Sequence, residues 1–327
     1  MKYETIGYTN LQVSKIGIGG NIFGYLLDEN QTKYLLDSAF DLGINFIDTA
    51  DVYSNGLSET LISKAISGRR DKWIIASKVG IKSDEESNGL GGKSNIKDKV
   101  EKSLKRLNTD YIDLYQLHHY DSKTPLEETL SAFEDLISEG KILYAGCSNF
   151  NFEQLETSLS ISSNQNLYGF SSIQLNYNLL KRNFEKNLLP LCLKHQIGVI
   201  VYGALGRGIL SDKYLNVDTG KAAYIPRAQM SESIRKDITP ELLALLSHLD
   251  GYAHEKFGSN LQTLAISWLL HQESLSSILL GMRSTVQLIE NLNALELKLT
   301  EENINEIDEL IGDYSVINSL SLGGFVN

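Results

Sequence analysis

Four side chains near the ends of apolar runs have the types and spacing that proton chemistry needs. Asp48 ends the run INFID, Lys78 follows IIAS, and His118 ends YIDLYQL. If these runs are neighbouring parallel strands, which lie about 5 Å apart, the three side chains meet at one edge. Tyr53 follows Asp48 on a short loop that can fold back toward Lys78. A carboxylate, an ammonium, an imidazole and a phenol are therefore expected to share one site.

The chemistry expected of such a site is general acid catalysis. A nearby Lys78 ammonium favours the phenolate of Tyr53, and Asp48 keeps that ammonium charged and oriented. A phenol made more acidic can donate a proton near neutral pH, which suits carbonyl reduction, with His118 hydrogen-bonded to the carbonyl oxygen. Any one of these residues alone would more simply mark the point where a strand reaches solvent. Their joint placement favours a catalytic site.

Strands that alternate with helices must position these residues. The predicted strands end near Ile18, Asp48, Lys78, His118, Ser148, Gln174, Tyr202 and Gly281. Most of these ends are roughly 30 residues apart, the length of one strand–helix unit of an eight-fold barrel. The last interval is longer and contains a polar insertion at residues 206–240, which is expected to be a cover over the site. We predict an α/β fold, a (β/α)8 TIM barrel, as a single domain over residues 1–327, with a long loop after strand 7 and a C-terminal helix.

A doubly wound sheet would show the same alternation, but its nucleotide-binding signature is missing. The sequence from Gly17 to Ile22 lacks the final glycine of GxGxxG. Tyr177 and Lys181 have the Tyr-x-x-x-Lys spacing of short-chain dehydrogenases, yet they directly follow a strand and the glycine-rich first turn is absent. These observations favour the barrel.

A metal site is not expected. Successive residues of a strand point to opposite faces, so His118 and His119 should not both reach one ion. No further His or Cys cluster completes a coordination shell. Cys147 and Cys192 have no CxxC spacing and are expected to be buried thiols.

Three local signals predict helix ends. Asn30 is a candidate N-cap, and Gly43 is placed where a left-handed residue would end the same helix. Thr124, Pro125 and Glu127 resemble a capping box with proline at the first helical position.

Composition excludes several classes of function. With 42% hydrophobic and 22% charged residues, the chain can bury a large core. A net charge of −11 argues against a nucleic-acid or anionic membrane partner. The sequence shows neither a basic and apolar N-terminal leader nor an apolar run of transmembrane length, and we expect a cytoplasmic protein.

At these residues the sequence resembles the aldo-keto reductase family. The resemblance covers nearly all of residues 1–310, through NFIDTADVY, IIASKV, DYIDLYQLHH, GCSNF, IQLNYNLL, VYGALGRGIL and GMRSTVQLIENLNAL. It implies a (β/α)8 barrel and hydride transfer between NAD(P)H and a carbonyl or alcohol. Tyr53 would be the proton donor, with Asp48, Lys78 and His118 as its partners. The chain is similar, to about the same degree, to cofactor-binding regulatory subunits of potassium channels.

The resemblance also implies where a dinucleotide would bind. The nicotinamide carboxamide would be hydrogen-bonded by Ser148, Asn149 and Gln174, and Tyr202 would stack on the ring. Leu205 and nearby backbone amides would contact the pyrophosphate. The remaining residues assigned to the cofactor are Gly208 and Gly281, together with Arg283 and Gln287 near the ribose and Glu290 and Asn291 near the adenine.

Some of these assignments have simpler alternatives. Ser148 and Asn149 would also suit the N-terminal cap of the following helix, and Glu290 would suit a solvated helix face. Many family members have lysine near Gly281, so Arg283 alone would hold a 2′-phosphate here. NADPH is the expected cofactor, and NADH is the alternative.

Three functions follow from these features. The first is reduction of an aldehyde, keto sugar or related small polar carbonyl compound, the second is NAD-linked oxidation of a sugar or alcohol, and the third is a cofactor-binding regulatory subunit. Specificity would reside in residues 83–95, 119–124 and 206–240. Polar candidates there are Asp84, Glu85, Lys93, His119, Tyr120, Arg207, Tyr224 and Arg227. The substrate and the oligomeric state are left open.

Overall fold

The computed structural model describes residues 1–80, 90–211, 215 and 237–312. Two compact units are distinguished. The first comprises Met1–Leu175, Phe184–Tyr202 and Ser274–Leu288, and the second comprises Asn176–Asn183, Gly203–Glu273 and Ile289–Asn327. The single domain over residues 1–327 stays a prediction. Several predicted features lie outside the described residues. They are the candidate substrate residues Asp84, Glu85, Tyr224 and Arg227, most of the predicted cover, at residues 216–236, and the C-terminal tail at residues 313–327.

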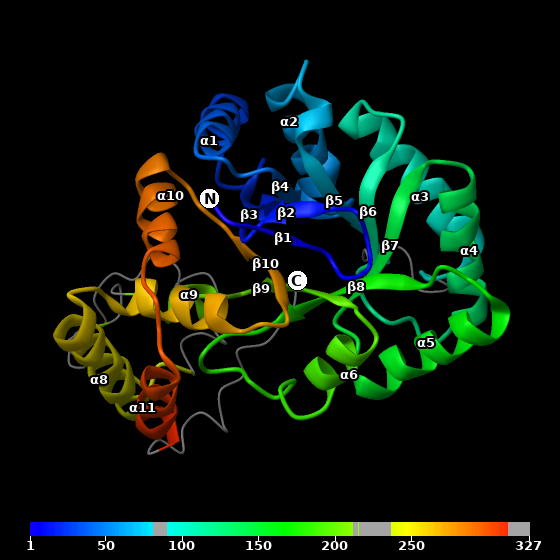
Figure 1. The fold of residues 1–327 in the computed structure, drawn as a ribbon. Coiled ribbons are helices and arrows are strands. Elements are labelled where there is room, and N and C mark those ends of the chain that lie inside the picture. The colour runs from blue at the N-terminus through cyan, green and yellow to red at the C-terminus, as the bar shows by residue number, and fades with distance from the viewer. Residues whose placement is uncertain (81–89, 212–214, 216–236, 313–327) are drawn as a thin grey trace. The chain divides into compact units, whose positions relative to one another are not determined.

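Eight parallel strands form a closed barrel in the first unit, in the order β10-β3-β4-β5-β6-β7-β8-β9. Figure 1 shows these strands with helices outside them. The strands are β3 Ile16–Gly19, β4 Phe46–Asp48, β5 Ile74–Val79, β6 Ile112–Leu117, β7 Ile142–Ser148, β8 Phe170–Asn176, β9 Gly198–Tyr202 and β10 Leu275–Leu280. The helices are α1 Glu29–Asp41, α2 Leu57–Ala65, α3 Lys93–Leu107, α4 Leu126–Ser138, α5 Phe152–Gln165, α6 Leu188–Lys194 and α10 Thr285–Leu292. The predicted (β/α)8 barrel is confirmed, and its strands end within two residues of the predicted positions.

A short hairpin covers the amino-terminal ends of the barrel strands. Its strands are β1 Tyr3–Thr5 and β2 Gln12–Ser14, paired antiparallel. Ile6, between them, is completely buried, and the neighbouring Gly7 packs against the backbone of Gly198, the first residue of β9. Since this end is closed by apolar side chains, polar chemistry is confined to the carboxyl ends of the strands.

The register of the strands brings the predicted polar residues to one level. Asp48 pairs with Ala76 of β5, two residues before Lys78. Ser148 at the end of β7 pairs with Gln174 of β8. Parallel neighbours in this register place their terminal side chains on the same rim, as the strand count predicted.

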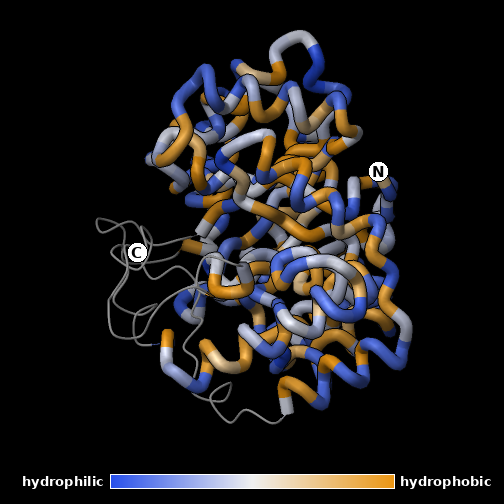
Figure 2. Tube along the Cα trace, turned by 90° about the vertical axis from the view of Figure 1, so that its left-hand side faces the viewer, coloured by the Kyte–Doolittle hydropathy of each residue, from blue (hydrophilic) through white to orange (hydrophobic). Residues whose placement is uncertain are grey.

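The outer helices of the first unit bury one face each. In α3 the buried apolar residues are Ile96, Val100, Leu104 and Leu107, the face that the sequence predicted. Figure 2 shows short hydrophobic and hydrophilic segments alternating along the chain. Such alternation is expected where one side of each helix meets strands and the other meets water.

Two of the three predicted helix signals are misplaced. α1 is capped by Asp28, in a capping box with Gln31, and not by Asn30. Gly43 does follow α1 in a left-handed conformation, with φ +85°. The predicted capping box before α4 is wrong, because Thr124 Oγ1 donates to Asp121 Oδ2 at 2.7 Å instead. The Asp121 carboxylate can accept hydrogen bonds from its own turn and so competes for the threonine.

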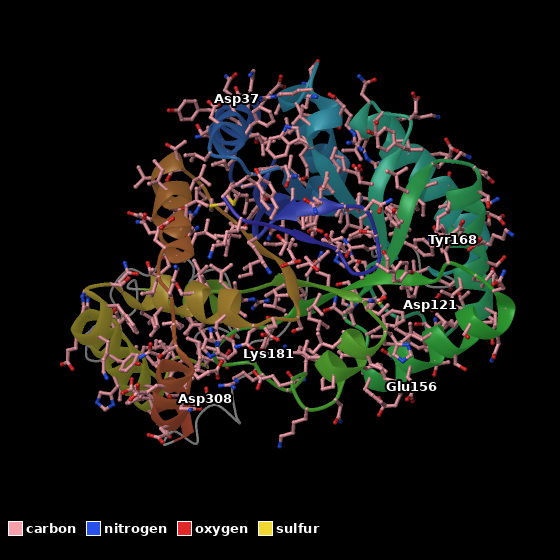
Figure 3. The ribbon with its side chains drawn as sticks, viewed as in Figure 1. Asp37, Asp121, Glu156, Tyr168, Lys181 and Asp308 are labelled. Atoms are coloured by element: carbon pink, nitrogen blue, oxygen red, sulfur yellow. The ribbon has the colours of Figure 1, made fainter. Side chains whose placement is uncertain are left out.

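The second unit contains the helices α8 Pro240–Phe257, α9 Leu261–His271 and α11 Glu301–Gly312. α11 is the predicted C-terminal helix. Its Asp308, marked in Figure 3, pairs with Arg182, whose guanidinium lies 4.7 Å from the centroid of the Trp268 ring. Within the described residues, none of the helices combines the length and apolar character that crossing a membrane requires.

Candidate active site

A buried ion pair between β4 and β5 forms the base of the site. Lys78 Nζ lies 2.5 Å from Asp48 Oδ2 and donates to the carbonyl oxygen of Thr49 at 3.0 Å. Both side chains are at most 5% exposed. Burial lowers the pKa of Lys78, and the Asp48 carboxylate opposes this effect. The contact with Asp48 favours the charged ammonium where desolvation alone would remove the proton.

Tyr53 reaches this ion pair from a short turn after β4. The turn Tyr53–Gly56 contains two non-glycine residues with positive φ, Ser54 at 49° and Asn55 at 54°. The phenol oxygen of Tyr53 lies 3.5 Å from Lys78 Nζ, which is also 5.2 Å from the ring centroid. The loop therefore folds back over Lys78, and the structure brings three of the four predicted residues together.

The acidity of Tyr53 differs from the prediction. Its pKa is raised well above the ordinary tyrosine value, first by burial and then by the charges of Asp48 and Asp51. The sequence suggested a more acidic phenol, because it shows the lysine but not the degree of burial. In this structure Tyr53 keeps its proton at neutral pH, so it is a hydrogen-bond donor and not a phenolate.

His118 completes the rim just beyond the end of β6. The residue is 7% exposed, and its ring lies edge-on to that of Tyr53, with 6.0 Å between centroids. Burial and the Lys78 charge hold the pKa of His118 well below its usual value, so the imidazole is neutral. Its Nδ1 atom is buried and has no hydrogen-bond partner among the described residues. A neutral imidazole has one N–H donor and one acceptor nitrogen, so it can hydrogen-bond a substrate oxygen.

His118 and His119 do not point to opposite faces, and that prediction is wrong. The two rings are stacked, with 5.3 Å between centroids and 10° between planes. β6 ends at Leu117, so the alternation of a strand no longer applies to the residues that follow it. In the described part of the chain, no three His, Cys, Asp or Glu side chains form a cluster that would hold a metal ion.

Four residues implied to bind a nicotinamide lie together on the same unit. Ser148 Oγ donates to the Gln174 carbonyl at 3.1 Å, and Asn149 Nδ2 donates to the His118 carbonyl at 3.1 Å. Tyr202 Oη donates to Asn149 Oδ1 at 2.6 Å. The helix-cap alternative for Ser148 and Asn149 is excluded, since Asn151 caps α5 with its own capping box.

Gln174 also contacts the ion pair. Its Nε2 donates to Asp48 Oδ1 at 2.8 Å, and Gln116 Nε2 lies 3.3 Å from the same atom. Gln116 was missed by the sequence reasoning. It pairs in register with Lys78, so the strand alignment would have found it. The two amides orient Asp48 by hydrogen bonds to the oxygen that Lys78 does not use.

The other implied cofactor residues are more dispersed along the chain. In the first unit, Arg283 and Gly281 are exposed, and the Arg283 amide donates to Gln287 Oε1 at 2.9 Å. In the second unit, Asn291 is buried and accepts from Gln262 at 2.8 Å, and Glu290 is exposed.

The phosphate-binding residues implied for the second unit lie in a short turn. The Gly208 amide donates to the carbonyl oxygen of Leu205 at 2.7 Å, closing the turn that contains Arg207 at φ 60°. The Gly208 amide therefore already donates a hydrogen bond within the protein. A phosphate site here would depend on the conformation of the turn and not on a hydrogen bond from this amide.

Three candidate substrate residues lie within the described part of the first unit, and His119 is the one that stacks on His118. Lys93 pairs with Asp135 at 2.8 Å on the surface. Tyr120 packs edge-on to Phe150, with 5.4 Å between ring centroids. These contacts engage Lys93 away from the rim, whereas Tyr120 follows His118 and His119 directly.

The chain is similar to known proteins over most of its length. The Aldo/keto reductase family model matches residues 15–312. Aldo-keto reductase YhdN of Bacillus subtilis is 35% identical over 298 residues, covering 88% of this chain and 87% of that protein. Uncharacterized oxidoreductase YqkF of the same organism is 33% identical, covering 94% and 95%. A Schizosaccharomyces pombe protein named Putative voltage-gated potassium channel subunit beta is 34% identical, covering 94% and 93%.

Proposed function

We propose that this chain, which belongs to the aldo-keto reductase family, is an oxidoreductase that reduces the carbonyl group of a small polar aldehyde or keto sugar with NADPH. The observation that carries the proposal is the contact of 3.5 Å between Tyr53 Oη and Lys78 Nζ, beside the buried Asp48 carboxylate. A protonated phenol next to an ammonium is suited to give a proton to an oxygen that becomes negative.

The residues near the strand ends fit a nicotinamide cofactor. A carboxamide offers both donors and an acceptor, and Ser148, Asn149 and Gln174 present hydroxyl and amide groups of both kinds on one unit. The exposed Arg283 guanidinium would suit a 2′-phosphate, which favours NADPH over NADH. When bound there, the cofactor would supply the hydride.

The protein's own groups would bind the carbonyl oxygen and supply the proton. His118, being neutral, would hydrogen-bond the oxygen and fix its position. Tyr53 would give its proton to this oxygen as negative charge develops there. Lys78 would then stabilise the resulting phenolate, and Asp48 would keep the ammonium in place. The roles of Lys78 and Asp48 are supported by the Lys78 contacts with Tyr53 and with Asp48.

A reduction assay with one pair of matched variants tests the proposal. Purified protein is mixed with NADPH, or NADH, and a panel of aldehydes and keto sugars, and loss of nicotinamide absorbance is recorded. We expect turnover with polar carbonyl compounds and a loss of about 10²-fold or more in Tyr53→Phe. Tyr34→Phe, at a tyrosine that is 67% exposed, should retain full activity. Undiminished activity of Tyr53→Phe would remove the phenol from the mechanism.

A regulatory, cofactor-binding subunit is the second candidate. It is favoured by the relative named as a putative potassium channel beta subunit, which matches 94% of this chain. Such a protein would retain cofactor through purification and turn over slowly. Rapid turnover with exchangeable cofactor would exclude this candidate. The cytoplasmic location and the lack of nucleic-acid and membrane partners stay predictions.

A further inference from the structure

A second cluster of buried charge lies behind Lys78. Glu59, in α2, is completely buried. Its Oε1 accepts a hydrogen bond of 2.6 Å from Ser77 Oγ, and its Oε2 lies 2.6 Å from Arg106 Nε. Ser77 immediately precedes Lys78 in β5 and points to the opposite face of the strand. Glu59 therefore holds, from the outside, the strand whose inner face carries Lys78.

Arg106 links this cluster to the turn that carries Tyr53. Its Nη2 donates to Ser103 Oγ at 3.1 Å, which fixes the guanidinium on α3. A Cβ atom built on Gly56, the last residue of the turn, would lie 2.7 Å from both Cδ and Nε of Arg106. Gly56 has φ +84°, and its lack of a side chain lets the guanidinium pack directly on the turn.

Asp51 brings a third charge to the same place. It lies two residues before Tyr53, and its Oδ1 atom is buried with no hydrogen-bond partner among the described residues. Burial and the Glu59 charge raise the pKa of Asp51 to about 6. The charged and titratable groups that act on Asp51 or feel its charge are Glu59 on α2, Lys99 and Arg106 on α3, Tyr115 on β6, Lys78 on β5 and Tyr53 in the turn.

We propose that Glu59 is a positioning residue, which together with Arg106 holds the Tyr53 turn against the strand that carries Lys78. The inference rests on the reductase function proposed above, because its kinetic consequences require turnover. Glu59 contacts neither Tyr53 nor Lys78 by hydrogen bond, and it acts through Ser77 on one side and Arg106 on the other. The gap of 3.5 Å between Tyr53 Oη and Lys78 Nζ is already at the limit of a hydrogen bond, so a small shift of the turn would break it.

The chain offers a matched control at the opposite end of the same strands. Arg70 Nη2 lies 2.7 Å from Asp113 Oδ2, which also accepts from the Ile75 amide at 2.9 Å. This pair, like Glu59 and Arg106, joins an arginine to a buried carboxylate beside β5, but it is far along the strand from Lys78. Neutralising either carboxylate leaves an arginine without its buried charge partner. Glu59→Gln and Asp113→Asn should therefore both lose thermal stability.

The test compares Glu59→Gln with Asp113→Asn. In Glu59→Gln we expect kcat to fall about tenfold or more with KM changed much less, because orientation and not substrate binding is lost. Because Asp51 lies two residues before Tyr53, we expect its ionisation near pH 6 to affect kcat. In Glu59→Gln this inflection of the kcat profile should move to lower pH, since Asp51 loses a neighbouring negative charge. Asp113→Asn should lower Tm while its kcat and pH profile stay those of the unmodified protein.

A crystal structure of Glu59→Gln gives a readout that needs no turnover. We expect the separation of Tyr53 Oη and Lys78 Nζ to exceed 3.5 Å. If the unmodified protein reduces no carbonyl compound with either cofactor, the proposed function fails, and this separation still decides the positioning role. An unmoved Tyr53, or kcat losses equal in the two variants, overturns the proposal. If Glu59→Gln does not fold, Arg106→Lys keeps the charge but loses Nε, and unchanged kcat in that variant overturns it as well.

Discussion

The ammonium of Lys78 lies 3.5 Å from the phenol oxygen of Tyr53 and 5.2 Å from the centre of its ring. This placement lets one cation hydrogen-bond the phenol and face its π system. The cation can be charged in so buried a place because Asp48 is in contact with it. The strength of the proton donor thus depends on an ion pair that the substrate need not touch.

Replacing Lys78 by methionine tests the role of this cation. Lys78→Met leaves the buried Asp48 carboxylate without its charge partner, which should cost roughly 3–5 kcal/mol of unfolding free energy. It also removes the charge that stabilises the phenolate, so kcat for carbonyl reduction should fall about 10²–10⁴-fold. Urea unfolding and initial rates measure the two effects. Lys102→Met, at an exposed lysine paired with Asp98, should change neither.

The raised pKa of Tyr53 predicts a reduction rate that this group leaves unchanged between about pH 6 and pH 10, and an oxidation rate that rises with pH. Reduction needs the protonated phenol, which is the form present up to and beyond the ordinary tyrosine pKa of about 10. Oxidation needs the phenolate, whose fraction rises with pH over the whole accessible range. Initial rates in both directions between about pH 6 and pH 10 check this. An oxidative rate that reaches a plateau near neutrality would contradict the raised pKa.

Asp51 should make the protein less stable as it ionises. Its pKa is about 6 in the folded chain against 3.8 without the fold, so between these values the folded state retains a proton that the unfolded state has lost. The free energy of unfolding therefore falls as pH rises through this window and stays lower above it.

Asp51→Asn removes this penalty. The variant should be more stable than the unmodified protein by about 1–3 kcal/mol at pH 8, with the difference shrinking toward about pH 4. Urea unfolding at the two pH values measures it. The low pKa of His118 destabilises the fold in acid, but it does so equally in both proteins and cancels in the comparison. A variant that is less stable at pH 8 would show that Asp51 is favourably solvated.

The sequence predicted the barrel and most of the rim because both follow from local periodicity. Asp48 and Ser148 end their strands as predicted, since an apolar run stops where a polar side chain appears. Glu59 was not found, although it lies three residues before Ile62 and so on the buried face of α2. Its partners Ser77 and Arg106 are 18 and 47 residues away, and only the folded chain brings them together.

Electrostatic detail was harder to predict than position. The sequence shows Lys78 beside Tyr53 but gives no measure of burial, which raises the pKa of the phenol more than any neighbouring charge. It also could not show that His118 and His119 lie beyond the last residue of β6, where their rings are free to stack. The predicted direction of the Tyr53 pKa shift failed because it depends on burial. The predicted orientation of His118 and His119 failed because it depends on the residue at which β6 ends.

Gly56→Ala tests the close packing of the Tyr53 turn against Arg106. Two effects should combine, the strain of alanine at φ +84° and the contact of 2.7 Å between the added Cβ and the guanidinium group. Gly68→Ala is the matched control, because Gly68 has φ +80° and nothing within 4 Å of an added Cβ. Strain alone should cost Gly68→Ala about 1 kcal/mol or a little more and leave kcat unchanged.

The difference between these two variants isolates the Arg106 contact. Gly56→Ala should be less stable than Gly68→Ala and should also lose kcat, because the turn that carries Tyr53 must move away from α3 to admit the methyl group. Thermal unfolding and steady-state kinetics on both variants measure this. Equal stability and equal kcat in the two would mean that Arg106 moves aside freely, and that the turn is held by its own backbone hydrogen bonds, such as that from the Tyr53 amide to Ala50 at 3.1 Å.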